Sequence, residues 1–171
     1  MGPSGSGKST LAAHLLVRGH QVWGDDLVFF APEEMYFAAA PRSLKLDAKA
    51  LSGIFLVASL CAESAIGTFL APDCWYVSPA AVRRRWAAEP GLADVVVLLE
   101  GDKSGPPAVD SVSPGEAAIR VVQSLLGSPA GRRGPDLRLK VLEALGDARA
   151  VRAGGGPPGA LARALEQELA T

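Results

Sequence analysis

The chain has 171 residues, enough for one compact domain, and 49% of them are apolar while only 6% are aromatic. Its 17 Lys and Arg nearly balance its 18 Asp and Glu, so the net charge of −1 excludes a general electrostatic attraction to nucleic acid or to an anionic membrane. Cys61 and Cys74 have neither zinc-site nor disulfide spacing, and the N-terminus lacks the basic start and apolar run of a signal peptide, so we expect a cytoplasmic protein.

A glycine-rich segment opens the chain and fits the phosphate-binding pattern G-x-x-x-x-G-K-[ST] at every constrained position. A helix is predicted over residues 7–18, directly after the last glycine. The glycines let the backbone come close to a phosphate, and the backbone amides and the helix N-terminus attract its negative charge. Lys8 is expected to contact the β and γ phosphates, and the Ser9 hydroxyl is expected to bind magnesium. The sequence therefore predicts that ATP and Mg²⁺ are bound by Gly2, Pro3, Ser4, Gly5, Ser6, Gly7, Lys8, Ser9 and Thr10.

Such a loop normally follows a buried strand, whereas only Met1 precedes this one. We expect Met1 to be the last residue of that strand in a longer protein. The fold is then predicted to lack the first strand of its phosphate-binding unit in this chain.

The next predicted elements are a strand over residues 21–23 and a hairpin of residues 27–30 with 35–39. The first strand ends at a pair of carboxylates, Asp25 and Asp26. Beside the loop, one carboxylate can accept a proton from an attacking hydroxyl and the other can hold magnesium. A turn or a helix cap is the structural alternative for this pair.

The middle of the chain carries weaker signals. Residues 41–46 are predicted to be extended and 47–51 to form a helical turn. The apolar stretch over 53–71 predicts a buried helix followed by a strand or loop, with a membrane span, interrupted by Glu63, as the alternative. A strand over 75–77 precedes a basic helix over 79–86, where Arg83, Arg84 and Arg85 favour a solvated face. A buried strand over 95–99 ends at Glu100, which is either a Walker B-like acid or a strand-terminal surface acid. His14 and His20 are isolated, which favours structural roles.

The last third alternates again between helix and strand. Ser113, Pro114 and Glu116 are typical of a capped helix start, and that helix should end near residue 126. The remaining predicted elements are a linker over 127–135, a helix over 137–145, a strand over 148–151, a loop over 154–159 and a helix over 160–169. The alternation predicts an α/β fold, with a core over residues 1–126 and a helix-strand-helix region over 127–171 packed on the same domain.

The run GPSGSGKSTLAAHLLVRGHQVWGDDLV at residues 2–28 resembles the HPr kinase/phosphorylase superfamily. Members of that superfamily have a P-loop, a helix that ends in an Arg-Gly-His or Arg-Gly-Tyr tripeptide, a short strand and an Asp-Asp pair. This chain has the same features in the same order, with Arg18-Gly19-His20 and Asp25-Asp26. The PRSLKL segment at residues 41–46 is similar to a step in short HPr kinase-like proteins, some of which accompany lasso-peptide and other ribosomal peptide pathways.

This resemblance implies a P-loop kinase domain related to the phosphoenolpyruvate carboxykinase nucleotide fold, with a mixed sheet and flanking helices. It implies transfer of the γ-phosphoryl group of ATP to a serine hydroxyl, with Lys8 and Ser9 as the phosphate and magnesium groups. Asp25 would be the base, and Asp26 would support the metal. The metal-binding glutamate signature of true HPr kinases is not found at residues 41–47, so a peptide or another small protein is the expected acceptor.

Other functions fit the loop as well. A small-molecule kinase of the gluconate or shikimate kind also has such a loop and an Asp after the next strand, and Arg83 to Arg85 could mimic its arginine-bearing lid. An inactive nucleotide-binding fragment is a further alternative. A transporter-type ATPase is disfavoured, because its LSGGQ-like signature and Asp-Glu strand end are absent from the sequence.

Overall fold

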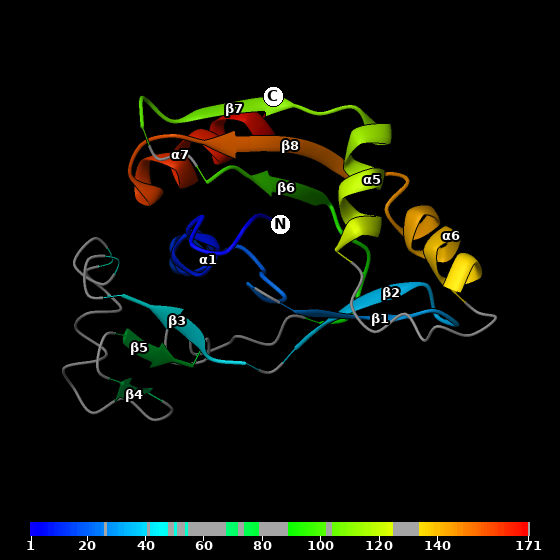
Figure 1. The fold of residues 1–171 in the computed structure, drawn as a ribbon, viewed down its shortest axis with the longest axis horizontal. Helices are drawn as coiled ribbons and strands as arrows, with labels where there is room; N and C mark the ends of the chain where they lie inside the picture. Colours follow the sequence, from blue (N-terminus) through cyan, green and yellow to red (C-terminus); the bar gives the residue numbers. More distant parts are fainter. Residues whose placement is uncertain are drawn as a thin grey trace.

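The structure is mixed α/β, as the sequence predicts, with helices α1, α5, α6 and α7 and strands β1 to β8 among the described residues. Figure 1 shows this computed structural model, which describes residues 1–25, 27–40, 42–47, 50, 54, 68–71, 74–78, 89–101, 104–124 and 134–170. None of the helices within those residues combines the length and the apolar character that a membrane crossing requires.

A three-stranded sheet organises one part of the molecule (Figure 1). Its strands, in the order β6-β8-β7, are Val95–Leu99, Arg149–Gly154 and Ala108–Ser111. β6 runs parallel to β8, and β7 runs antiparallel to it. Val96 and Leu98 enter one apolar cluster while Leu99 enters another, because successive side chains of a strand point to opposite faces. Burial on both faces explains why β6 is a continuous apolar run.

One face of this sheet is covered by α1 (Lys8–Val17) and α7 (Pro158–Leu169). Leu11 of α1 and Leu161 and Leu165 of α7 are buried in one cluster with Leu99 and Val151. The contact between the two helices continues at their ends, where Glu166 accepts hydrogen bonds from Arg18 and His20. The helix that follows the N-terminal glycine-rich segment is therefore fixed against the C-terminal helix.

A second small sheet packs on the other side of α1 (Figure 1). Its strands, in the order β3-β5-β4, are Leu44–Leu46, Cys74–Val77 and Thr68–Ala71, all antiparallel to their neighbours. Leu44, Leu46 and Val77 of this sheet are buried together with Leu16 of α1. The α1 helix is thus enclosed from two sides, which holds its N-terminus in place.

The opposite face of β6 and β8 is covered by α5 (Pro114–Gln123) and α6 (Gly134–Ala144). Phe30 and Phe37 join that cluster from the hairpin of β1 (Val28–Ala31) and β2 (Tyr36–Ala39). Their rings lie 5.0 Å apart between centroids. The hairpin is therefore fixed on the side of the sheet away from α7.

Several predicted elements are confirmed, with shifted ends. The strands predicted over 75–77, 95–99 and 148–151 and the hairpin over 27–39 correspond to β5, β6, β8 and β1-β2. The predicted start of α5 is confirmed, since the Glu116 amide donates to the Ser113 hydroxyl at 3.3 Å. The carboxylate of Glu116 accepts a hydrogen bond from Arg152 of β8.

Two predictions are wrong. Residues 21–23 form no strand, because Val22 packs against the cluster beneath α1 and the Trp23 ring stacks on Phe37 at 5.9 Å between centroids. The helix predicted to reach residue 126 ends at Gln123 with Ser124 as its C-cap. The β7 strand has no counterpart among the predicted elements.

Some predictions fall on residues outside the described part. These are Asp26, Pro41, the basic helix with Arg83, Arg84 and Arg85, most of residues 53–71 and most of the 127–135 linker. Of the turn predicted over 47–51, the structure describes the Asp47 carboxylate accepting from the Ala50 amide at 2.6 Å.

Candidate functional site

The N-terminal loop (residues 2–7) has the backbone that its glycines permit. Gly5 and Gly7 have φ angles of +78° and +94°, a region that side-chain-bearing residues seldom adopt. Gly7 is the N-cap of α1, and the Leu11 amide is the first to bond back along the helix, to the Gly7 carbonyl at 2.9 Å. The amides of the first turn have no acceptor within a helix, so this end carries partial positive charge.

Lys8 ties the first residue of the helix back to the start of the loop. Its Nζ donates to the carbonyl oxygens of Gly2 and Pro3 at 3.0 and 2.9 Å. The Ser6 amide also donates to Pro3, at 3.3 Å. The loop is thereby closed into a compact arch with an ammonium group at its centre, which is a suitable shape and charge for an anion.

The loop leaves the edge of the sheet beside β6. The Met1 amine donates to the Val97 carbonyl, and the Leu99 amide donates to the Met1 carbonyl. This is the pattern of a parallel strand with Met1 opposite Leu98, so Met1 extends the edge of the sheet beside β6. A Cβ on Gly2 would lie 2.4 Å from the Leu99 carbonyl oxygen, so only glycine allows this close approach.

The structure brings the loop's serine and the first of the predicted carboxylates together. The Ser9 hydroxyl donates a hydrogen bond to Oδ2 of Asp25, and the pair is half-buried. A Cβ on Gly24 would lie 2.5 Å from the Leu27 carbonyl oxygen, so a tight turn presents Asp25. The preceding Trp23 is fixed by its hydrogen bond to the Glu89 carbonyl at 3.0 Å. Asp26, predicted to hold the metal, lies outside the described residues.

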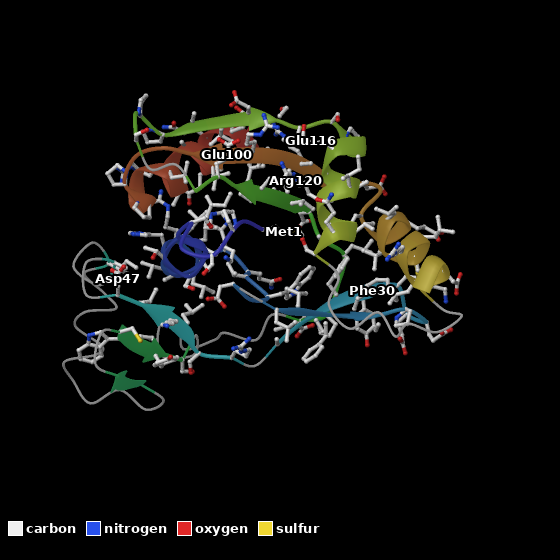
Figure 2. The ribbon with its side chains drawn as sticks, in the orientation of Figure 1. Met1, Phe30, Asp47, Glu100, Glu116 and Arg120 are labelled. Atoms are coloured by element: carbon white, nitrogen blue, oxygen red, sulfur yellow. The ribbon has the colours of Figure 1, made fainter. Side chains whose placement is uncertain are left out.

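A group of charges lies on the other side of the loop. Glu100 directly follows β6, and Arg152 Nε lies 3.1 Å from its carboxylate. Arg152 also binds Glu116 of α5, so one guanidinium joins both acids. Figure 2 shows Glu100, Glu116 and Arg120 gathered above Met1. These residues line a groove of about 480 Å³ between the N-terminal loop and α5. The pairing with Arg152 weakens the case for Glu100 as a Walker B-like acid.

Both histidines have structural contacts. His20 shares Glu166 with Arg18, at 2.8 Å from the carboxylate. His14 lies against Gly159, where a Cβ would come within 3.0 Å of the imidazole ring. Burial first, then the charges of Arg18 and Arg163, lower the pKa of His14. Neither ring lies in a cluster of three or more potential metal ligands, and no such cluster occurs in the part of the chain that the structure describes.

Sequence reasoning missed a second glycine-rich segment at the site. Gly154 ends β8, Gly155 and Gly156 follow it, and all three line a small hollow next to the N-terminal loop together with Ser6 and Gly7. The available signal was three consecutive glycines placed between a predicted strand and a predicted helix, which we interpreted only as a connection.

Comparisons with protein-family models, with curated proteins and with solved structures find no match to this chain.

Proposed function

We propose that this protein is an ATP- and magnesium-dependent kinase that transfers the γ-phosphoryl group to a serine hydroxyl of a peptide or small protein. The observation that carries the proposal is the hydrogen bond from Ser9 to Asp25 at the N-terminus of α1. It joins the hydroxyl of a phosphate-binding motif to a carboxylate that lies 16 residues further along the chain. The resemblance to HPr kinase-like P-loop proteins supports the same function.

The residues present fit a nucleoside triphosphate with Mg²⁺. The arch closed by Lys8, the positive end of α1 and the glycines with positive φ suit an anion. The Ser9 hydroxyl offers an oxygen ligand of the kind that a hard cation prefers, and Asp26, the residue after its partner Asp25, would supply a carboxylate. Bound magnesium neutralises negative charge on the β and γ phosphates.

The chain's own groups then account for the transfer. The arch and Lys8 hold the phosphates, and Asp25 accepts the proton from the acceptor serine. A bond forms between the serine oxygen and the γ-phosphorus while the bond from that phosphorus to the β–γ bridging oxygen breaks. The bridging oxygen keeps the electron pair and leaves on ADP. In this assignment Asp25 is the base and Asp26 supports the metal.

The surface beyond Asp25 favours a polypeptide acceptor. β1 begins three residues after Asp25, and its Val28 and Phe29 side chains are 40% and 54% exposed. These two side chains point to opposite faces of the strand, and either one could contact an apolar side chain of a bound peptide, which a small hydrophilic acid lacks.

The test is incubation of the protein with γ-labelled ATP, Mg²⁺ and a panel of serine-containing peptides and small proteins, with gluconate and shikimate as parallel acceptors. The proposal predicts label on a serine of a polypeptide, as an acid-stable and alkali-labile ester. It is overturned if the label goes to a small-molecule acceptor, or if no polypeptide in a panel that includes neighbouring-gene products is labelled.

A further inference from the structure

The groove of about 480 Å³ between the N-terminal loop and α5 has both apolar and charged walls. Met1, which is 37% exposed, and Pro3 line it on the side of the loop. Arg120 and Gln123 line it on the side of α5. Ligand pockets have volumes of about 300–1,000 Å³, so this groove has room for a few residues of a polypeptide.

Two arginines line the groove, and they differ in their partners. Arg152 binds Glu116 and lies 3.1 Å from the carboxylate of Glu100, so it neutralises the acids of the groove. Glu116 lies one helical turn before Arg120, but its carboxylate is taken by Arg152. The exposed guanidinium of Arg120 has no hydrogen-bond or ion-pair partner among the described residues. Arg120 is therefore available to a carboxylate of a ligand, which a guanidinium can bind with two parallel hydrogen bonds.

The groove meets the N-terminal loop at Gly2 and Pro3. Lys8 Nζ donates to the carbonyl oxygens of these two residues at 3.0 and 2.9 Å. One end of the groove therefore lies next to the ammonium group that is proposed to hold the terminal phosphates. Asp25, which bonds to Ser9, lies across the loop from this end.

From this arrangement we propose that the groove docks the acceptor polypeptide, and that Arg120 selects acceptors with an acidic side chain near the phosphorylated serine. An apolar side chain of the acceptor lies on Met1 and Pro3, its carboxylate binds Arg120, and the chain continues across the loop to present the serine. A polypeptide is favoured over a small anion because it can use the apolar wall and the charged wall together. The inference rests on the proposed function, because it takes the ligand to be the phosphoryl acceptor.

The first test measures peptide binding by fluorescence anisotropy without ATP, so its result does not depend on catalysis. The probes are short fluorescein-labelled peptides with one serine and one leucine among alanines and glycines, and with a pair of Glu, Gln or Lys residues on either side of the serine. The intact protein should bind its best Glu peptide about fivefold more tightly than the matching Lys peptide, and high salt should reduce the difference.

Two variants and a control assign this preference to Arg120. Arg120→Gln should abolish the preference, and Arg120→Glu should reverse it in favour of the Lys peptide. Arg138→Glu is the matched control, because Arg138 is exposed on α6 and does not line the groove. The control should keep the original order, and all three variants should be checked for folding by circular dichroism.

The second test measures transfer from γ-labelled ATP to the same peptides. Arg120→Gln should raise the KM for the Glu peptide about fivefold and leave kcat and the Kd for ATP within twofold, because Arg120 acts on docking alone. The inference is overturned if the intact protein binds the Glu and Lys peptides equally, or if Arg120→Glu keeps the original order. Binding in the predicted order without transfer of label would overturn the proposed kinase activity, whereas transfer without a charge preference would overturn only the docking role of the groove.

Discussion

Replacement of Lys8 by alanine should weaken ATP binding more than any other single change in the loop. The ammonium group lies at the centre of the arch, with the Gly2 and Pro3 carbonyls at 3.0 and 2.9 Å. Two unit charges about 4 Å apart attract by about 1 kcal/mol in water and about 4 kcal/mol at an effective dielectric constant near 20. Lys8 is half-buried, so we place the loss between these two limits, at about 1.4–2.8 kcal/mol, or about 10- to 100-fold in Kd.

The assay is titration calorimetry of Lys8→Ala with Mg²⁺ and ATP. Lys140→Ala is the matched control, because Lys140 lies on α6 and pairs only loosely with the exposed Glu33 at 3.7 Å. The control should keep its Kd, and both variants should be checked for folding by circular dichroism. A folded Lys8→Ala protein that binds ATP within twofold of the original would refute the role of Lys8 in phosphate binding.

Two further predictions concern stability. Leu16 is 1% exposed in the cluster between α1 and β3. Leu16→Ala should therefore lower the free energy of unfolding, measured by urea titration, by about 2–5 kcal/mol. A loss below about 1 kcal/mol would contradict the packing of Leu16 in that cluster. Hydrogen bonds from Arg18 and His20 lower the pKa of Glu166 to about 2, from its usual value of 4.5. The ionised carboxylate therefore stabilises the fold at pH values above 4.5, and this contribution is lost as the pH falls from about 4.5 to about 2. Glu166→Gln should therefore be less stable by about 0.5–1 kcal/mol near pH 6, the range for partly exposed pairs, and urea midpoints should converge with those of the original protein in acid. A pH-independent difference would show that the charge of Glu166 is not the cause.

Local patterns predicted the elements whose determinants lie within a few residues. The G-x-x-x-x-G-K-S motif predicts a tight loop and a helix start because its glycines set the backbone angles of the loop and the helix begins at Lys8, directly after them. Ser113 and Pro114 predict the start of α5 for the same reason. The apolar run of β6 is evident because both of its faces are covered.

Long-range contacts decide what the sequence could not show. The apolar residues after α1 look like a strand, but Trp23 and Val22 are used for packing against distant residues. The sequence does not predict β7, because three of its four residues are exposed and no apolar pattern marks it as a strand. Its backbone is held by antiparallel pairing with β8, which lies far along the chain. Arg152 is one charged residue in a strand, and nothing local indicates that it binds Glu100 and Glu116. The hollow at Ser6 is formed by segments about 150 residues apart.

The most direct measurement of the central claim is phosphoryl transfer by Asp25→Asn. The amide keeps the size of the side chain and can still accept from Ser9, but it cannot take a proton. Transfer from γ-labelled ATP to a serine acceptor should fall by about 10²–10⁴-fold, while the Kd for ATP stays within about threefold. Asp110→Asn, on exposed β7, should transfer at the original rate. Full turnover by Asp25→Asn would contradict the assignment of Asp25 as the base.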